Sequence, residues 1–541
     1  MAKTKYVFVV GGVLSGVGKG VAVASIGRIL KNRGLHVSAM KIDPYVNIDA
    51  GTMNPVEHGE VFVTADADET DQDIGNYERF LDTDITSINY MTTGRVYQSV
   101  IEKERSMYYK GRCVQVVPHI PLEVIERIKK AARASRVDVM VIEIGGTVGE
   151  YENILFLEAA RMMKLETSND VAFVLVSYLP IPGNLGEMKT KPTQHAARAL
   201  NSSGIQPDMI IARGKTELDK PRREKLAVLC GLREQADVIA APDVENIYEV
   251  PNVFERQHVA ERLAAKLNLK FKQSKAAAWD RFIGKVKKAR QPVKIALVGK
   301  YFSTGTFTLA DSYISVIEAI KHAAWSVGAK PELTWIDAEA YEADPGKVKE
   351  LGGFDAILVP GGFGVRGVEG IMRAIEFARV NQVPYLGLCY GMQLACVEFA
   401  RHVLGKKSAH TVEIDKNTPD PIIHINPTQA KNVKENRYGG TMRLGSYRCA
   451  LKKESHARRL YGAAEITERH RHRYEFNNEY LLEMEQAGIL FSGINPESNL
   501  VEIIELKNHP YFVASQFHPE FQSRPLRPHP LFVGLIKAAL K

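Results

Sequence analysis

Near its start the chain reads YVFVVGGVLSGVGKGVAVASIGRIL, residues Tyr6–Leu30. The apolar run Tyr6–Val10 predicts a buried strand, the glycine-rich run Gly11–Gly20 a tight loop, and Val21–Leu30 a helix. Glycines let backbone N–H groups turn toward a phosphate, the helix N-terminus adds a partial positive charge, and Lys19 adds a full one. We therefore expect a phosphate-binding loop here, rather than a glycine turn without a ligand.

The same alternation of strand and helix continues through the first half of the chain. The stretch Leu122–Arg133 is amphipathic, as expected of a helix on a sheet. Strands with nearly continuous apolar sequence, separated by helices, indicate a parallel sheet covered on both faces. The predicted strands are Val37–Ile42, Val139–Ile144, Val171–Ser177, Met209–Ala212 and Val238–Ala240.

A second alternation begins further along the chain. Its predicted strands are Val293–Val298, Leu333–Ile336, Ala356–Val359 and Tyr385–Leu388, and short strands at Leu490–Phe491, Leu500–Glu505 and Phe512–Gln516 suit a sheet edge with hairpins. We predict an α/β protein of two doubly wound domains, residues 1–268 with a P-loop-like, mostly parallel sheet, and residues 293–541. Lysines crowd residues 269–292, which we interpret as a partly helical linker.

Composition narrows the class of protein. At 541 residues, with 45% hydrophobic and 25% charged residues, the chain has the make-up of a multidomain soluble protein without the run of about 20 apolar residues that a membrane span needs. The net charge of +8 favours solvated surface and pockets for polyphosphates. No basic block is interleaved with aromatic residues, so we expect no nucleic acid partner. Five cysteines without a CxxC spacing suit a reducing compartment, and we expect a cytoplasmic location.

The phosphate loop departs from the Walker A pattern at two positions, and at the first of them the leading glycine, Gly12, lies one residue too far from Gly18-Lys19. Gly20 stands where a Ser or Thr hydroxyl normally helps to hold Mg²⁺. Carboxylates elsewhere must replace that hydroxyl, and the candidates are Asp73 and Glu143, although an acid such as Asp73 is by itself as readily a solvated surface group. The basic segment Lys189–His195, with Lys225, could hold a second triphosphate; taken alone it is more readily a helix start with exposed lysines.

A thiol site is predicted in the second domain. Cys389 lies between Gly387 and Gly391, where a strand ends and a helix begins, as in a nucleophile elbow. Downstream, His518 and Glu520 flank a proline, which favours extended geometry and places both side chains on one face. A Cys–His–Glu arrangement is typical of acyl transfer. The inert alternative is a buried thiol, as we expect for Cys230 and Cys396.

A second glycine turn, Pro360–Gly364, follows the predicted strand Ala356–Val359. Its backbone N–H groups, together with that of Tyr390, are candidates for an oxyanion hole.

These motifs together resemble the glutamine-hydrolysing CTP synthases, from end to end of the chain. The second-half motifs alone would indicate only a class I glutamine amidotransferase. The blocks that carry the resemblance are Gly11–Gly20, Lys41–Tyr45, Glu57–Val63, Asp73–Phe80, Glu143–Gly149, Lys189–His195, Gly387–Gln393, Glu468–Glu475 and Gln516–Glu520.

The resemblance implies a synthetase (amidoligase) domain over residues 1–268 and a class I glutamine amidotransferase α/β domain over residues 293–541. In the implied reaction, ATP phosphorylates the 4-oxygen of UTP, and ammonia released from glutamine at Cys389 displaces that phosphate to give CTP. The resemblance also implies Mg²⁺ with ATP and no organic prosthetic group, inhibition by CTP, activation by GTP at a lid over Asn432–Gly445, and a homotetramer, while filament formation stays an open hypothesis.

The resemblance further implies roles for individual residues. Catalysis falls to Cys389, His518 and Glu520, and the metal to Asp73 and Glu143. Contacts to ATP are implied for Gly16, Val17, Gly18, Lys19, Gly20, Val21, Asp73, Pro242, Asp243 and Val244. Contacts to UTP or CTP are implied for Ser15, Glu150, Tyr151, Glu152, Lys189, Thr190, Lys191, Pro192, Thr193, Gln194 and Lys225. Contacts to glutamine are implied for Gly362, Tyr390, Gly391, Met392, Gln393, Glu413 and Arg473.

Three other hypotheses stay open at the level of sequence. The chain could be a glutamine-dependent amidoligase with a different acceptor, which the Lys189–His195 block argues against. It could be a nucleotide-binding switch protein, for which Cys389 would have no role. A filament-forming structural role is compatible with the enzyme.

Overall fold

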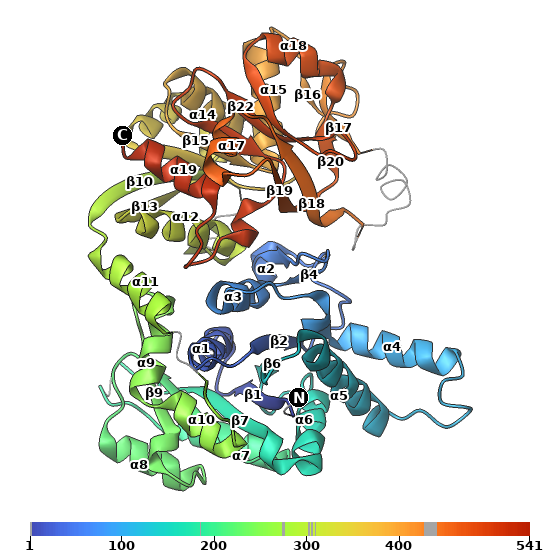
Figure 1. Ribbon diagram of the computed structural model, residues 1–541, viewed down its shortest axis with the longest axis vertical. Helices are drawn as coiled ribbons and strands as arrows, with labels where there is room; N and C mark the ends of the chain where they lie inside the picture. Colours follow the sequence, from blue (N-terminus) through green and yellow to red (C-terminus); the bar gives the residue numbers. More distant parts are fainter. Residues whose placement is uncertain are drawn as a thin grey trace. The chain divides into compact units, whose positions relative to one another are not determined.

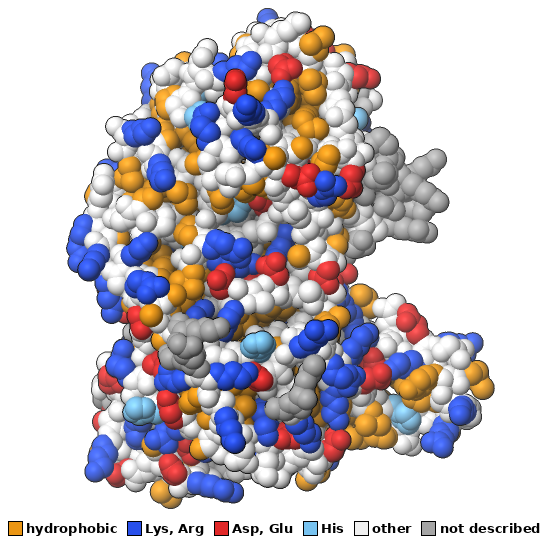
Figure 2. All heavy atoms as spheres, viewed as in Figure 1, with side chains coloured by type: hydrophobic (Ala, Val, Ile, Leu, Met, Phe, Trp, Pro, Cys, Tyr) orange, Lys and Arg blue, Asp and Glu red, His pale blue; other side chains and the backbone are white. Residues whose placement is uncertain are grey.

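The computed structural model describes residues 3–183, 186–272, 276–300, 303–304, 307–308, 310–426 and 441–541 (Figure 1). The chain forms two compact units, described separately below. Unit 1 comprises Met1–Ala50 and Asp73–Ile283, and unit 2 comprises Gly51–Gln72 and Gly284–Lys541. Within the described ranges, no helix has both the length and the apolar character needed to cross a membrane. Figure 2 shows Lys and Arg side chains spread over the visible face with acidic side chains among them, as expected of solvated surface.

Unit 1 is built on a seven-stranded sheet in which every neighbouring pair is parallel. The strand β1 lies in the middle of the sheet, between β6 and β7, and later strands are added on both sides of it. The strands in spatial order are β5 (Tyr90–Thr92), β2 (Val37–Asp43), β6 (Val139–Thr147), β1 (Lys5–Gly11), β7 (Val171–Tyr178), β8 (Met209–Gly214) and β9 (Val238–Pro242). The predicted parallel α/β sheet is confirmed.

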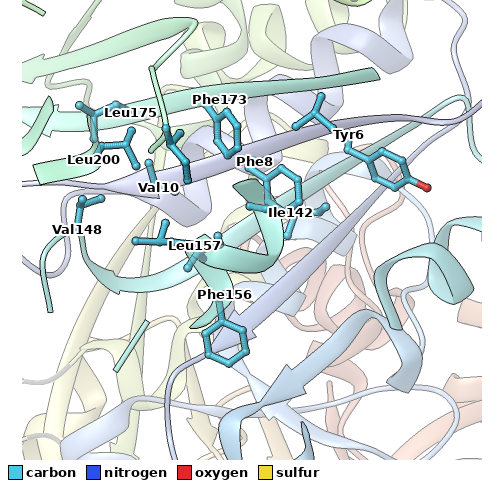
Figure 3. Packing of buried hydrophobic residues seen from close by; sticks show 14 of the residues in the cluster. Tyr6, Phe8, Val10, Ile142, Val148, Phe156, Leu157, Phe173, Leu175 and Leu200 are labelled. Carbon is cyan, nitrogen blue, oxygen red and sulfur yellow. The ribbon is translucent and has the colours of Figure 1, made fainter. Parts of the chain in front are cut away.

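Both faces of this sheet are buried, which explains the continuous apolar sequence of its strands. Phe8 and its neighbours two residues away on β1 pack beneath helices α5 (Val116–Ser135), α6 (Ile154–Glu166) and α7 (Lys191–Ser202) (Figure 3). The Phe8 ring stacks on Phe173 of β7 with a centroid separation of 5.6 Å. Helix α1 (Lys19–Asn32) runs from the phosphate loop back along the sheet, and 12 of its residues are buried.

The predicted linker is partly a helix, α11 (Ala277–Lys288). Its first turns belong to unit 1, because Trp279 and Phe282 pack against Tyr248 at centroid separations of 5.9 and 5.6 Å. The Arg28 guanidinium lies 4.9 Å from the centroid of the Trp279 ring. The residue boundaries 268 and 293 remain predictions.

Unit 2 is built on a nine-stranded sheet that is parallel at one end and antiparallel at the other. In spatial order its strands are β13 (Ala329–Asp337), β10 (Gln291–Gly299), β14 (Ala356–Val359), β15 (Tyr385–Leu388), β23 (Phe512–Ser515), β22 (Val501–Leu506), β21 (Ile489–Ile494), β18 (Arg443–Leu451) and β19 (Glu465–His472). Helices α14 (Val368–Val380) and α15 (Tyr390–His402) contribute to one core cluster, and α12 (Ile314–Ser326), α17 (His456–Tyr461) and α19 (Pro530–Ala539) to another.

The prediction that Phe512–Gln516 lies at a sheet edge is wrong. Strand β23 lies between β15 and β22, in the interior of the sheet. All four of its side chains are buried, and a short run without polar alternation is what a central strand requires. The edge is formed instead by β19, whose sequence EITERHRH has too few apolar residues for the strand to be predicted.

A hairpin from the first half of the chain belongs to unit 2. It consists of β3 (Val61–Val63) and β4 (Glu69–Asp71), which are paired antiparallel. Phe62 is fully buried and meets Phe521 edge-on at 5.0 Å between centroids. Arg469 donates a hydrogen bond to the Val63 carbonyl at 3.1 Å, and Arg471 forms an ion pair of 2.8 Å with Glu69. By these contacts residues 51–72 are part of the core of unit 2, although sequence order predicts them in the first domain.

The hairpin generates a prediction about stability. Replacing Phe62 with Ala removes a fully buried ring, which costs about 3–5 kcal/mol in typical cores. We expect Phe62→Ala to lower the denaturant midpoint of unit 2, monitored by protection of the buried Cys449 thiol, while Val46→Ala at an exposed position leaves it unchanged. Equal midpoints for Phe62→Ala and the unaltered protein would show that the hairpin contributes nothing to this core.

Candidate active site

The thiol of unit 2 lies on a strained elbow between strand and helix. Cys389 follows β15 and precedes the first residue of α15, with φ 51° and ψ −98°. This backbone region disfavours any side chain and is characteristically retained where function requires it. The Cys389 backbone amide donates to the Ser515 carbonyl of β23 at 2.7 Å, and the side-chain Nε2 of Gln516 lies 3.7 Å from the Cys389 Sγ. The elbow predicted from sequence is confirmed.

His518 and Glu520 meet beside this thiol. Nδ1 of His518 lies 2.7 Å from a Glu520 carboxylate oxygen, and both side chains are buried. The prediction of extended geometry is wrong: Pro519–Gln522 forms a 3₁₀ turn that begins at His518. The turn still brings the two side chains together, because it folds Glu520 back toward the ring.

The charge on His518 is set by its neighbours. Burial alone would lower the pKa of His518, but the Glu520 carboxylate and the Cys389 sulfur raise it to about 10. A His with this pKa is protonated at neutral pH, so it carries a proton available for donation.

The second glycine turn adjoins the same thiol. A Cβ atom at Gly361 would lie 2.8 Å from Cε1 of His518 and 3.7 Å from the Cβ of Cys389, so only glycine fits there. Gly362 lies against the Tyr390 ring, and the Gly364 amide donates to Glu413 at 2.8 Å. The structure thus brings the predicted turn, thiol, imidazole and Glu413 together.

The remaining residues predicted to bind glutamine have mixed surroundings. The Met392 side chain is buried in the hydrophobic core, and a Cβ on Gly391 would lie 2.4 Å from the Val359 carbonyl. Gln393 is buried and donates to the Tyr474 carbonyl at 3.0 Å. Arg473 donates to the Thr441 hydroxyl at 3.0 Å. Of the predicted lid Asn432–Gly445, only residues 441–445 lie within the described part of the chain.

A second centre lies in unit 1, around the phosphate loop. Val13, Gly16 and Gly18 have positive φ values of 82°, 69° and 88°, and α1 begins directly after Gly18. Lys19 is buried and donates to the Gly146 carbonyl at 2.9 Å. Burial lowers the pKa of Lys19, against the opposing influence of Glu143.

The absent hydroxyl at position 20 has a structural explanation. A Cβ atom at Gly20 would lie 1.9 Å from Oδ1 of Asp73, which is in the first turn of α3 (Gln72–Leu81). The space that a Ser or Thr side chain would need is therefore filled by the Asp73 carboxylate. Gly20 is needed because the Asp73 carboxylate lies against it. This contact fits the expectation that a carboxylate takes the place of the missing hydroxyl.

Lys41 joins the two predicted metal ligands. It lies on β2, and its ammonium forms ion pairs with Asp73 and, at 3.0 Å, with Glu143, which lies within β6. The Tyr77 hydroxyl donates to Glu143, and Asp43 lies 3.7 Å from the same ammonium. Burial and the nearby Asp73 raise the pKa of Glu143, while Lys41 opposes this. Sequence reasoning gave Lys41 no role beyond its place in a motif.

Most of the residues predicted for ATP and UTP lie in segments that follow neighbouring parallel strands of the unit 1 sheet. Gly12 packs so closely on Ala196 of α7 that a Cβ there would lie 2.3 Å away. This contact places the first turn of α7, where Lys191–Gln194 begin the helix, near the phosphate loop. Glu150 accepts a hydrogen bond from the Thr147 amide at 2.6 Å, and Tyr151 is 93% exposed.

The other residues predicted to bind nucleotides lie after β7 and β8 and at or just after the end of β9, at the same edge of the unit 1 sheet. The Lys189 ammonium pairs with Glu187, and Lys225 is exposed on α8 (Lys220–Leu229), whose Arg222 donates to the Met188 carbonyl at 2.9 Å. Asp243 pairs with Arg213 at 2.7 Å, and Arg213 also donates to the Val17 carbonyl of the phosphate loop. Arg213 was not predicted, because a lone Arg at a strand end has no sequence signature.

Comparisons with known proteins cover both halves of the chain. Residues 5–269 match the family model for the CTP synthase N-terminus, and residues 308–538 match glutamine amidotransferase class-I. The CTP synthase of Caldanaerobacter subterraneus subsp. tengcongensis is 51% identical, over 99% of this chain and 98% of the relative. The CTP synthase of Thermococcus kodakarensis is also 51% identical, over 99% of each chain. A solved glutaminase domain of Trypanosoma brucei CTPS with bound acivicin is 34% identical, with a TM-score of 0.42, over 46% of this chain and 94% of that one.

A parallel α/β unit with a phosphate loop and an amidotransferase unit with an elbow thiol define a glutamine-dependent ligase that forms C–N bonds. More particularly, the chain belongs to the CTP synthase family. The resemblance seen in the sequence is confirmed over nearly the full length.

The His518–Glu520 pair generates a prediction about pH. Since the folded pKa is raised, the pair stabilises the folded protein fully below the ordinary His pKa, and this stabilisation is lost as pH rises through about 10. In Glu520→Gln the carboxylate charge is absent, so we expect the His518 imidazole to titrate below 10, measured by NMR with His518→Asn for assignment. An unchanged titration would show that Glu520 does not set the charge of this ring.

Proposed function

We infer that this chain converts UTP to CTP, using ATP and the amide nitrogen of glutamine. The observation that carries this conclusion is the presence of both centres in one chain that is about 50% identical to CTP synthases over nearly its whole length. A phosphate loop with paired carboxylates suits phosphoryl transfer, and an elbow thiol with a His–Glu pair suits amide cleavage.

At the thiol centre, we assign Cys389 as the nucleophile. With the thiol proton already on His518, the Cys389 thiolate attacks the side-chain carbonyl of glutamine. The negative charge that forms on the oxygen is met by backbone N–H groups of the Pro360–Gly364 turn and the first turn of α15. The protonated His518 gives its proton to the departing nitrogen, so that ammonia leaves and a thioester remains. Water, deprotonated by the now neutral imidazole, then releases glutamate. Glu520 orients the ring through Nδ1.

The same centre offers groups for the other end of glutamine. Glu413, held by the Gly364 amide, is an anionic partner for the substrate ammonium group. The guanidinium of Arg473 can bind the substrate carboxylate with two parallel hydrogen bonds. Gly362, Tyr390, Gly391, Met392 and Gln393 would contribute through their backbone, because their side chains are absent, buried in the core or bonded within the protein.

In unit 1, we assign ATP to the phosphate loop, residues Gly16–Val21, with Pro242–Val244 at its adenosine end. Lys19 and Lys41 offer positive charge where the γ-phosphoryl group would pass to the 4-oxygen of UTP. Such a transfer depends on in-line placement and neutralisation of charge. The triphosphate of UTP would lie at the start of α7 and near Ser15, Lys189 and Lys225, since a helix N-terminus with lysines binds anions.

The residues of unit 1 fit a magnesium ion. Asp73 and Glu143 already share one cationic group, the Lys41 ammonium, so the pair can accommodate positive charge between them. Carboxylate oxygens together with phosphate oxygens are the ligands that Mg²⁺ prefers. We therefore assign Asp73 and Glu143 as the metal ligands; bound Mg²⁺ would neutralise phosphate charge, and Lys41 would be free to turn toward the transferred phosphoryl group.

Regulation and assembly complete the proposal. We assign CTP inhibition to the turn Glu150–Glu152 and GTP activation to the segment around 432–445. The long helical hairpin of α4 (Thr93–Arg105) and α5 suits contact between subunits of a homotetramer, and filaments would build on that assembly (Figure 1). Its exposed large apolar residues are Ile101, Met107, Tyr108, Val116, Val117 and Leu122. The five free thiols suit a cytoplasmic location.

The function is tested by product formation with a matched pair of cysteine variants. We expect CTP from UTP, ATP and glutamine, and loss of this activity in Cys389→Ala by at least about 100-fold, with ammonia-driven synthesis retained. Cys396→Ala removes a thiol that lies within α15, seven residues after Cys389, and whose pKa is raised by burial, and it should keep both activities. If no CTP forms in the unaltered protein, the proposed reaction is refuted.

The assignment of Asp73 makes a separate prediction. UTP must be phosphorylated before ammonia can attack it, whether the ammonia comes from glutamine or from solution. Asp73→Asn should therefore reduce both glutamine-driven and ammonia-driven CTP formation by about 100-fold or more. It should also reduce the rise in melting temperature that MgATP causes. Asp84→Asn, at an exposed position of the same unit, is the control. Full ammonia-driven synthesis in Asp73→Asn would contradict the assignment.

A further inference from the structure

A buried lysine outside the predicted site residues lies next to the thiol centre of unit 2. Lys300 directly follows β10 and is 7% exposed, which is unusual for a lysine without a full set of partners. Its ammonium donates to the carbonyl oxygen of Phe363 at 3.1 Å and also to that of Gly364. The same ammonium lies 3.3 Å from the Tyr390 hydroxyl.

The contact with Tyr390 has a second part. The Lys300 ammonium lies 4.4 Å from the centroid of the Tyr390 ring, at the distance of a cation–π interaction. The Tyr390 hydroxyl in turn donates to the Gly364 carbonyl at 2.8 Å. Lys300, Tyr390 and Gly364 therefore form a closed set of contacts that ties together the segments following β10, β14 and β15.

Two of these segments carry the candidate oxyanion hole. Gly361 and Gly362 immediately precede the two carbonyls that Lys300 binds, and Gly361 adjoins both Cys389 and His518. Tyr390 is the residue after Cys389 and the first of α15. One ammonium thus fixes the distance between the turn and the helix start on either side of the thiol.

We propose that Lys300 is a positioning residue for glutamine hydrolysis, holding the Pro360–Gly364 turn against Tyr390 so that the backbone N–H groups around Cys389 keep their places as charge develops on the amide oxygen. It touches no reacting atom. The proposal rests on the glutaminase role proposed above. Small displacements of such donors are costly, because the hole stabilises charge only when its N–H groups are preorganised.

The surroundings of Lys300 make its charge sensitive to pH. The ammonium faces Glu413, and Glu342 and Glu339 of α13 (Glu339–Ala343), which favour the charge, and Arg366, which opposes it. Burial outweighs these and lowers the pKa of Lys300 to about 8. Above that pH the neutral amine loses its attraction to the Tyr390 ring and donates weaker hydrogen bonds.

The first test compares Lys300→Met with Lys294→Met, an exposed lysine on the same strand. With ATP, UTP and GTP present at pH 7, we expect kcat for glutamine hydrolysis to fall about 10- to 100-fold in Lys300→Met with a smaller change in KM, and no change in Lys294→Met. Ammonia-driven CTP synthesis should be unchanged in both variants.

The second measurement separates positioning from folding. Iodoacetamide alkylates a thiol by displacement at carbon and develops no oxyanion, so the rate at Cys389 should be the same in Lys300→Met as in the unaltered protein. Slowed alkylation to the same extent as hydrolysis would show that Lys300 only supports the fold, and would overturn the proposal.

The third measurement uses the pH profile. The unaltered protein should lose kcat for glutamine hydrolysis as pH rises through about 8, and Lys300→Arg, whose guanidinium stays charged, should shift this loss to higher pH. Unchanged kcat in Lys300→Met, or an identical alkaline limb in Lys300→Arg, would overturn the proposal. An unaltered protein that hydrolyses no glutamine would instead refute the glutaminase role itself, a result that is distinguishable from either outcome.

Discussion

In both units one geometric constraint gathers the functional groups: parallel strands that run side by side must all end at the same edge of the sheet. In unit 1 this edge receives the loop after β1 and the segments after β6, β7, β8 and β9, while Glu143 lies within β6. In unit 2 it receives Lys300 after β10, the glycine turn after β14 and Cys389 after β15. Residues far apart in sequence meet there without long loops, which is why two different chemistries use the same type of sheet.

The groups at these edges are held in states that are unfavourable by themselves. Cys389 has a left-handed φ, Lys19 and Lys300 are buried with lowered pKa values, and Glu143 is buried beside Asp73. Each costs free energy that the surrounding packing must offset. Such costs are typical of sites that must present charge or a nucleophile before the substrate arrives. The glycines at positions 20, 361 and 391 permit the close contacts involved.

Glycine patterns and apolar runs made much of the fold and both centres predictable. The elbow at Cys389, the loop at Gly11–Gly20 and most parallel strands follow from local sequence. Two predictions were wrong because the outcome depends on tertiary contacts, namely the position of β23 in the sheet and the backbone geometry at Pro519. For the same reason the polar edge strand β19 was not predicted. Lys41, Arg213 and Lys300 also escaped prediction, because a single basic residue acquires meaning only from the carbonyls and carboxylates that other strands bring to it.

The hairpin of residues 51–72 bears on how such a chain could arise. Fusing two genes end to end gives a polypeptide that passes between its units once, whereas this chain passes between them three times, after Ala50, Gln72 and Ile283. Fusion alone therefore does not account for this arrangement of the chain. Conversely, splitting the gene at the linker would give an amidotransferase unit that lacks Phe62. The space of this buried ring beside Phe521 would then have to be filled by another side chain.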